Sequence, residues 1–542
     1  MPPDGPPKGP AAAPGLAEGG LSAGLSASLS ASLSDWLSQR HGWLADLPVT
    51  PRIRHVGTVQ ETGDGVAQIA GLPATRLDEL LQFADGTLGM AVQVTPDRVG
   101  CILLRADGGI AAGTEVRGTG EILQVPVGDG LLGRVVDPLG APLDEGGPVA
   151  AAGYLPVDRP APAIVDRELV GEPLMTGLTV VDAMVPLGRG QRELIIGDRK
   201  TGKTAVAVDA IINQRDTDVI CVYAAVGQKS SSVAQVIEAV RSHGAPERCI
   251  FVVAAADATP GAQWIAPYAA CSMAEHVRDR GGHALLVIDD LSKHAAAYRQ
   301  LSLLLRRPPG REAYPGDIFY IHARLLERAA RLSAARGGGS LTALPIAETQ
   351  AGNLSAYIPT NLISITDGQI YLDTKLFYEG QKPAVNVGLS VSRVGARSQA
   401  PAMRALARQL RLDYAQFLEL ETFTRFGGAL DRRTAATIAH GRRIRQVLQQ
   451  PQFGPKPLAE QALLLLAAGE GRLDGLAPAA IDRFAAGLAA RLDAAAPRLA
   501  ARIAAEGALS DQDRAAALQL IDAFVAELAG PATAPEAGDG DR

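Results

Sequence analysis

A phosphate-binding loop signature, set between a strand-like and a helix-like segment, constrains this chain more than any other feature of its sequence. Residues 197–204 read Gly-Asp-Arg-Lys-Thr-Gly-Lys-Thr, which matches G-x-x-x-x-G-K-[ST]. Residues 193–196 are strand-like, and residues 205–214 follow with a helical pattern. In that setting backbone N–H groups curl around a phosphate at a helix N-terminus, where the dipole favours negative charge. The sequence therefore predicts a nucleotide-binding α/β core.

The loop also predicts roles for individual side chains. Lys203 is expected to contact the β- and γ-phosphates, and the hydroxyl of Thr204 to ligate Mg²⁺. The nucleotide-binding set expected in the loop is Gly197, Asp198, Arg199, Lys200, Thr201, Gly202, Lys203 and Thr204. The cofactors indicated are ATP or ADP with Mg²⁺.

A carboxylate for the metal follows further along the sequence. Residues 284–290 form an apolar run that ends in two aspartates, and Asp289 is expected to hold Mg²⁺ through a water molecule. An acidic pair after a strand is on its own more often a helix cap, but together with the phosphate loop it favours the metal role. Two more apolar runs, 219–225 and 249–254, each precede a helical stretch and supply further strands of a RecA-like core.

Gln228 bears on whether this site hydrolyses its nucleotide. In RecA-like ATPases a glutamate after the neighbouring strand commonly polarises the attacking water, and the corresponding stretch here ends in Gln228. A neutral amide has no oxygen as basic as a carboxylate, so it is a poor general base at neutral pH. Glutamine does orient water in small GTPases, which leaves slow hydrolysis open. The sequence favours a site that binds nucleotide without turning it over.

Composition bounds the rest of the molecule. Its 542 residues are 47% hydrophobic, enough for several cores at about 150 residues per domain. The net charge of −6 gives no electrostatic reason to expect a nucleic-acid partner, and no run approaches the ~18–20 apolar residues of a membrane helix. Four widely spaced cysteines argue against a zinc site.

Changes in sequence pattern divide the protein into five segments. Short β-like runs between turn signals predict an antiparallel β-barrel over 49–118, and alternating strands and helices predict the RecA-like domain over 119–400. Ala/Leu/Arg-rich stretches predict an α-helical domain over 401–529. Residues 1–48 are interpreted as a low-complexity extension whose leucine stripe is either a docking helix or a linker, and 530–542 as a disordered tail.

Longer stretches around these motifs resemble the alpha subunit of F-type ATP synthases. They are residues 188–194, 289–317, 359–368 and 391–395, and in the second of them DDLSK and AYRQ lead into LLLRRPPGREAYPGD. The resemblance spans roughly residues 57–452, with its motifs in the same order along the sequence. It implies three alpha and three beta subunits alternating around a central rotor shaft, joined to a peripheral stalk. It also implies an indirect membrane association at the cytoplasmic face of the bacterial inner membrane.

The resemblance further implies roles for four residues. Arg393 occupies the family's arginine-finger position and would reach the nucleotide held by the adjacent beta subunit. Ser364 matches a position near that shared phosphate site, and Gln450 and Gln452 match positions whose amides can pair with adenine. The protein would then be the non-catalytic, regulatory subunit of a two-sector ATPase that couples ATP synthesis or hydrolysis to proton or sodium transport.

Several residues depart from the family pattern, and two of them are expected beside the nucleotide. Lys200 stands where the family usually has glutamine and adds a cation beside the phosphates, and Lys382 stands where an arginine is customary, losing planar stacking near the adenine. These differences suggest a divergent or second-copy version of the subunit.

Three other functions compete with this interpretation. A self-sufficient export-type ATPase would need a carboxylate at position 228 or just after it, and residues 229–232 provide none. A hexameric RNA translocase predicts aromatic side chains for base stacking in the barrel, but Phe83 is the only aromatic residue in 56–119. A purely structural protein would have no need of Lys203, Thr204 and Asp289 together.

Overall fold

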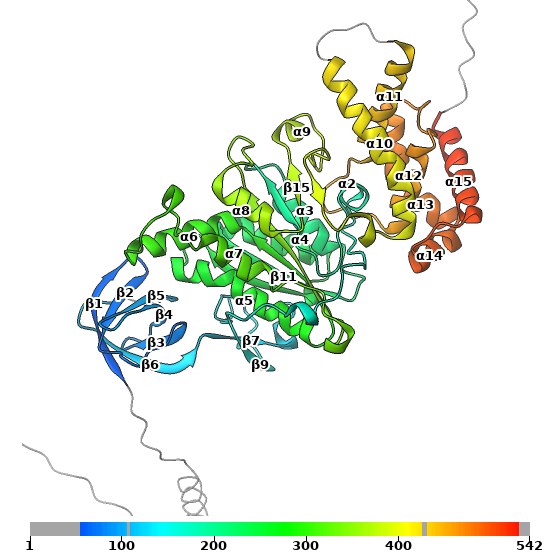
Figure 1. Ribbon diagram of the computed structural model, residues 1–542. Coiled ribbons are helices and arrows are strands. Elements are labelled where there is room, and N and C mark those ends of the chain that lie inside the picture. Colours follow the sequence, from blue (N-terminus) through cyan, green and yellow to red (C-terminus); the bar gives the residue numbers. More distant parts are fainter. Residues whose placement is uncertain (1–54, 106–108, 425–430, 530–542) are drawn as a thin grey trace, which may run out of the picture. The chain divides into compact units, whose positions relative to one another are not determined.

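The structure is a computed structural model that describes residues 55–105, 109–424 and 431–529 (Figure 1). A β-barrel, a central α/β domain built on a mostly parallel sheet and a C-terminal helical domain follow one another in that order. This confirms the predicted fold class. The expected N-terminal docking helix and C-terminal tail, 1–48 and 530–542, lie outside the described residues.

The barrel is closed by antiparallel strands in the order β1-β2-β5-β4-β3-β6, with β6 pairing back onto β1. Its strands are β1 (Val56–Gly63), β2 (Val66–Ala70), β3 (Glu79–Phe83), β4 (Leu88–Val94), β5 (Val99–Leu103) and β6 (Glu115–Ile122). Glycine at position 89 is required by packing, because a Cβ there would lie 2.4 Å from Cys101 Sγ inside the barrel. Strand β6 continues four residues beyond the expected barrel end at 118, since Ile122 still pairs with Glu79.

The central sheet has the order β16-β15-β10-β14-β13-β11-β12-β8, and only the β15–β16 pair is antiparallel among its described strands. Its strands are β8 (Val135–Val136), β10 (Leu194–Gly197), β11 (Val219–Gln228), β12 (Cys249–Ala255), β13 (His283–Asp289), β14 (Ser340–Glu348), β15 (Gly368–Leu372) and β16 (Val391–Ser392). A separate two-stranded ribbon pairs β7 (Gln124–Val127) with β9 (Gly153–Pro156).

Both faces of the central sheet are buried, and alternate residues of its strands belong to two different cores. In β11, Cys221 and Tyr223 face one core while Val222 and Ala224 face the other, as the two-residue period of a strand requires. The first core is covered by α2 (Thr179–Met184), α3 (Lys203–Ile212) and α4 (Ser230–His243). The second is covered by α5 (Pro260–Asp279), α6 (Leu291–Leu304), α7 (Ile318–Leu326) and α8 (Tyr357–Ile365). Continuous apolar strands of this kind are typical of parallel sheets.

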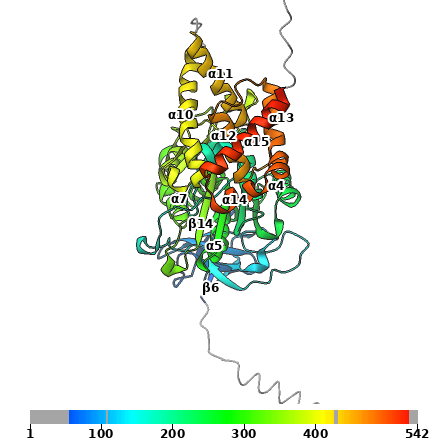
Figure 2. The same cartoon turned by 90° about the vertical axis from the view of Figure 1, so that its right-hand side faces the viewer.

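The C-terminal domain is a bundle of helices that shares the first core (Figure 2). Its helices are α10 (Pro401–Thr424), α11 (Arg432–Val447), α12 (Leu458–Gly469), α13 (Pro478–Ala495), α14 (Pro497–Glu506) and α15 (Asp511–Ala529), and the short α9 (Thr374–Tyr378) precedes them. Helix α12 is buried from Ala459 to Ala468 and is the centre of the bundle. No helix in the described part of the molecule is long and apolar enough to cross a membrane.

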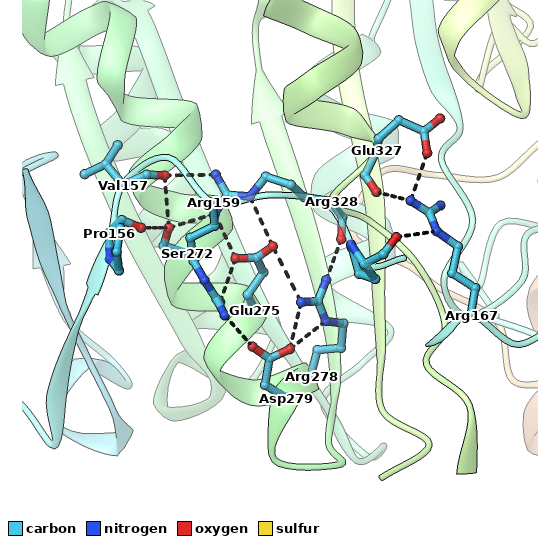
Figure 3. Close-up of polar contacts among 11 residues, drawn as sticks. Pro156, Val157, Arg159, Arg167, Ser272, Glu275, Arg278, Asp279, Glu327 and Arg328 are labelled. Atoms are coloured by element: carbon cyan, nitrogen blue, oxygen red, sulfur yellow. Dashed lines mark hydrogen bonds and ion pairs between the residues drawn. The ribbon is translucent and has the colours of Figure 1, made fainter. Parts of the chain in front are cut away.

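A buried ion cluster joins α5 to the segment after α7 (Figure 3). Arg328 has a fully buried side chain that donates to both carboxylate oxygens of Glu275, at 3.1 and 2.8 Å, and to Ser272 Oγ and Val157 O. Arg159 pairs with the same carboxylate at 2.9 Å. Buried charges are costly unless they are paired and hydrogen-bonded, and here the guanidinium makes four hydrogen bonds to three residues.

Candidate functional site

The phosphate loop lies between β10 and α3, as the motif predicts. Gly197 ends the strand and Lys203 begins the helix, and Gly202 adopts a left-handed conformation with φ of 94°. The amine of Lys203 donates to the carbonyls of Gly197 and Asp198 at 3.0 and 2.7 Å, so it lies folded over the loop. Burial lowers the pKa of Lys203, while nearby carboxylates act in the opposite direction. A bound phosphate would replace these loop contacts with a full negative charge.

Not every residue of the loop faces the nucleotide cavity. The carboxylate of Asp198 accepts hydrogen bonds from Thr349 Oγ1 at 2.6 Å, Gly352 N at 2.9 Å and Thr374 Oγ1 at 3.1 Å. Asp198 therefore anchors the loop to neighbouring segments. Arg199, Lys200 and Thr204 line the cavity, and Lys200 is exposed there with a positive φ of 63°.

Thr204 and Asp289 meet where the magnesium site was predicted. Thr204 Oγ1 lies 2.8 Å from Asp289 Oδ2, which also accepts from the buried hydroxyl of Tyr223 at 2.9 Å. Asp289 ends β13 and is buried. A hydroxyl and a carboxylate oxygen held together in this way suit a hard divalent cation such as Mg²⁺, so the residues present fit the metal.

Gln228 completes this cluster from the end of β11. Its amide nitrogen donates to Asp289 Oδ1 at 2.6 Å, and its carbonyl oxygen accepts from Lys293 Nζ at 2.6 Å. Lys293 belongs to the first turn of α6, whose N-cap Asp290 accepts from the Lys293 backbone N–H at 2.7 Å. Both ends of the Gln228 amide are thus engaged, and its oxygen is held by a cation.

One cavity of about 890 Å³ extends from these residues to the loop between α11 and α12. Gln452 and Phe453 line its far end, together with His243 from the end of α4. The rings of His243 and Phe453 stack with centroids 5.1 Å apart. The Phe453 backbone N–H donates to Asp209 Oδ1 at 2.8 Å, which ties this loop to α3, the helix that follows the phosphate loop. The volume suits a ligand of nucleotide size.

Gln450 and Gln452 do not lie together in the cavity. The Gln450 side chain is buried, accepts from the Thr179 backbone N–H at 3.1 Å and donates to the carbonyls of Gly177 and Gly454 at 2.7 Å each. Its amide has no free donor or acceptor directed at a nucleotide. Gln452 is exposed and lines the cavity, so of the expected pair only Gln452 has a side chain that faces it.

Arg393 and Ser364 lie on the surface, away from this protein's own cavity. The guanidinium of Arg393 donates to Thr366 O at 3.0 Å and to Ile363 O at 3.2 Å, at the C-terminal end of α8. Ser364 is exposed in the last turn of α8, and its hydroxyl donates to Thr360 O at 2.9 Å. The two side chains therefore flank the same helix end, where carbonyl groups favour a cation.

Sequence reasoning left several side chains of this site without a role. Lys293 lies within a quoted motif, but its contact with Gln228 joins segments that are not adjacent in the sequence. Tyr223 and His243 carry no local signal, because only the packing of α4 and β11 brings them to the cavity. Asp209 is buried in α3 and acts on the cavity only through its contact with Phe453. Phe453 directly follows Gln452, and an aromatic residue beside an expected base contact was the one available signal.

Comparison with known proteins follows the domain order of the structure. Family models match the β-barrel domain of the ATP synthase alpha/beta family at residues 53–120 and its nucleotide-binding domain at 177–392. A third family model, for the C-terminal domain of ATP synthase alpha/beta chains, matches residues 399–524.

Several curated relatives cover most of the sequence. A protein of Gluconobacter oxydans named ATP synthase subunit alpha 2 is 58% identical over 479 residues, 88% of this chain and 94% of that protein. Proteins of the same name are 59% identical in Burkholderia pseudomallei strain 1710b, over 86% of this chain and 71% of theirs, and 58% identical in Burkholderia thailandensis, over 88% and 85%.

Proposed function

Because the chain belongs to the ATP synthase alpha/beta family, as an alpha subunit of the F type, we propose that it holds Mg-ATP without hydrolysing it and completes the catalytic site of a neighbouring beta-type subunit. The nucleotide held at this subunit's own site would have a regulatory role. The subunit would contribute to catalysis only at the site of its neighbour. The name that its relatives share supports a second-copy alpha subunit.

The single observation that carries this proposal is the engagement of Gln228 at both ends. A general base must accept a proton from water, but the carbonyl oxygen of this amide is weakly basic, and the Lys293 cation that it accepts from at 2.6 Å opposes protonation further. Among the described residues, two other acidic side chains line the cavity, and one oxygen of each already has a partner. Glu348 Oε2 pairs with Arg199 Nε at 3.2 Å, and Glu238 accepts from Ser242 Oγ at 2.9 Å.

Nucleotide binding is supported by the phosphate loop and by the other residues that line the cavity. The Lys203 amine and the loop N–H groups would hold the phosphates, Thr204 and Asp289 would hold Mg²⁺, the latter through water, and Gln452 would meet the adenine. The metal would neutralise phosphate charge when bound. Exposed Lys200 adds a cation at the mouth of the phosphate loop.

Arg393 is proposed as the arginine finger for the beta-type neighbour, with Ser364 beside it. Among the described residues this exposed guanidinium donates to backbone carbonyls and forms no ion pair, which leaves its charge available to an incoming phosphate. The further parts of the proposal follow from the family. They are an alternating hexamer around a rotor shaft, a peripheral stalk, indirect attachment at the cytoplasmic face of the bacterial inner membrane, and coupling to proton or sodium transport.

Two measurements test the proposal. The isolated protein should retain Mg-ATP while releasing no phosphate at steady state, whereas steady hydrolysis by the isolated protein would favour an export-type ATPase. In a complex assembled with a beta-type subunit, Arg393→Ala should leave assembly intact and slow turnover by ~10³-fold or more. A near-normal rate would overturn the finger role.

A further inference from the structure

Glu193 directly precedes β10 and has a fully buried side chain, an unfavourable position for a carboxyl group. Its Oε2 accepts from Gln191 Nε2 at 2.7 Å. Its other oxygen, Oε1, is buried and has no hydrogen-bond partner among the described residues. Burial raises the pKa of Glu193 well above its usual value, while the charge of Arg393 acts in the opposite direction. Packing alone does not explain a carboxyl group here, because an apolar side chain would fill the same space without this cost.

The amide that holds Glu193 also holds the residue before Arg393. Gln191 Nε2 donates to Ser392 Oγ at 3.2 Å as well as to Glu193. The Ser392 hydroxyl in turn donates to Pro186 O at 2.8 Å and accepts from the Gly395 backbone N–H at 3.2 Å. The backbone on both sides of Arg393 is therefore tethered to the segment that leads into β10.

The carboxyl group also fills a space that β15 leaves open. A Cβ at Gly368 would lie 2.7 and 2.8 Å from the two oxygens of Glu193 and 2.1 Å from Val391 O. Glycine at 368 thus lets Glu193 reach the β15–β16 pair. The Arg393 backbone N–H donates to Asp367 O at 2.8 Å, so the residue before this glycine also fixes Arg393.

The contacts of Glu193, Gln191 and Ser392 do not involve the guanidinium group of Arg393. Among the described residues, no carboxylate forms an ion pair with Arg393, although Asp367 pairs with Arg192 at 2.8 Å and Arg192 also pairs with Glu327. The Arg393 side chain is therefore held only by the carbonyl groups at the end of α8 among the described residues, while its backbone N–H is fixed by the carbonyl of Asp367.

We propose that Glu193 is a positioning residue for Arg393, acting through Gln191 and Ser392 to fix where Arg393 leaves the sheet. This rests on the proposed function of Arg393. Since β10 ends in the phosphate loop four residues later, Glu193 also connects the position of Arg393 to the protein's own nucleotide site.

The test uses the full-length protein assembled with a beta-type partner. Glu193→Ala should lower kcat roughly ten- to hundredfold and leave KM for Mg-ATP near the wild-type value, because a displacement of ~1 Å can cost ~10²-fold. Glu193→Gln keeps an acceptor oxygen for Gln191 and should retain most of the rate. Glu172→Ala is the control, since it removes only the nearby pair with Arg331 and should leave the rate unchanged.

The decisive measurement combines the variants. If Glu193 acts through Arg393, Glu193→Ala should have no further effect in the Arg393→Ala background. An equal loss in both backgrounds, or a wild-type kcat for Glu193→Ala beside a slow Arg393→Ala, would overturn the inference and leave the proposed function standing. A wild-type rate for Arg393→Ala would instead overturn the proposed function.

If Glu193→Ala does not assemble, a milder variant, Ser392→Ala, tests the same inference. Ser392→Ala removes the hydroxyl that Gln191 contacts and leaves the buried carboxyl in place. It should reproduce the loss of kcat, and that loss should again vanish in the Arg393→Ala background. A wild-type kcat for Ser392→Ala would contradict the inference.

Discussion

Gln228 Nε2 lies 2.6 Å from Asp289 Oδ1, so the side chain in the position of a water-activating glutamate donates a hydrogen bond to the predicted metal carboxylate. A carboxylate at 228 could not make this contact. The amide of Gln228 donates to Asp289 through its nitrogen and accepts from Lys293 through its oxygen.

Gln228→Glu is therefore expected to produce no steady hydrolysis by the isolated protein. The new carboxylate would face Asp289 across the distance that an N–H donor now bridges, and it would pair with Lys293. Mg-ATP binding should weaken roughly ten- to hundredfold, since unpairing a buried polar group costs ~1–3 kcal/mol. Phosphate release and equilibrium binding check this, with Gln228→Ala as the uncharged control. Sustained phosphate release by the glutamate variant would contradict this expectation and show that the amide at 228 alone keeps the wild-type site silent.

Gln452→Ala should weaken ATP binding and leave stability unchanged, whereas Gln450→Ala should lower the stability of the fold. The exposed Gln452 lines the cavity, so its loss should weaken ATP binding about two- to tenfold with an unchanged unfolding temperature. Gln450→Ala should lower the free energy of unfolding by ~1–3 kcal/mol, because backbone groups of Gly177, Thr179 and Gly454 lose their partner. Titration calorimetry and thermal unfolding of both variants distinguish them. Weakened binding with unchanged stability in Gln450→Ala would restore Gln450 as a nucleotide contact.

Asp209 should make stability depend on pH. Burial raises the pKa of Asp209 to about 6, against the hydrogen bond from the Phe453 N–H, which lowers it. Because the pKa of Asp209 is higher in the folded protein than the unfolded value of 3.8, protonated Asp209 favours the folded state. This contribution to the free energy of unfolding is fully present below pH 3.8 and is lost as pH rises through about 6.

Asp209→Asn keeps an acceptor for Phe453 and cannot ionise. Its free energy of unfolding near pH 7.5 should exceed that of the wild type by on the order of 2 kcal/mol. The wild-type decline between about pH 4 and pH 7 should be absent in the variant. The free energy of unfolding is measured from about pH 4 to pH 7.5 for the wild type and the variant. The exposed Asp216→Asn serves as the control. A variant that keeps the wild-type slope would exclude Asp209 as its cause.

Arg328→Met should destabilise the fold strongly. It leaves the buried Glu275 without its main partner, and breaking a buried pair costs ~3–5 kcal/mol. The matched control is Arg336→Met, which breaks an exposed pair with Asp166 and should cost at most ~1 kcal/mol. Adding Glu275→Gln to Arg328→Met should recover part of the loss. Equal unfolding temperatures for the two single variants would show that the buried cluster contributes little.

The parts of this molecule that sequence alone predicts are those with a short, local chemical requirement. The phosphate loop, the aspartate that ends β13 and the glutamine that ends β11 each depend on a strand and the few residues after it. Parallel strands then bring these ends to one edge of the sheet, which is why the separate motifs meet.

The far end of the cavity depends on contacts that local reasoning does not reach. Gln450 and Gln452 are equivalent as residue types, and the choice between them depends on Asp209 fixing the backbone of Phe453, which has a φ of 63°. That contact joins α3 to a loop more than two hundred residues away. Glu193 presents the same difficulty, since its burial depends on the glycine at 368 in another strand.

The strand order β16-β15-β10 places the backbone before Arg393 two strands from the backbone that enters the phosphate loop. Neighbouring strands lie about 4.8 Å apart, which makes this offset roughly 10 Å. On the proposed function, rotation of the shaft could change how closely adjacent subunits approach and so whether Arg393 meets a nucleotide. Rotation would not change the distance between Arg393 and the phosphate loop of the same subunit, because the hydrogen bonding of a single sheet fixes that distance.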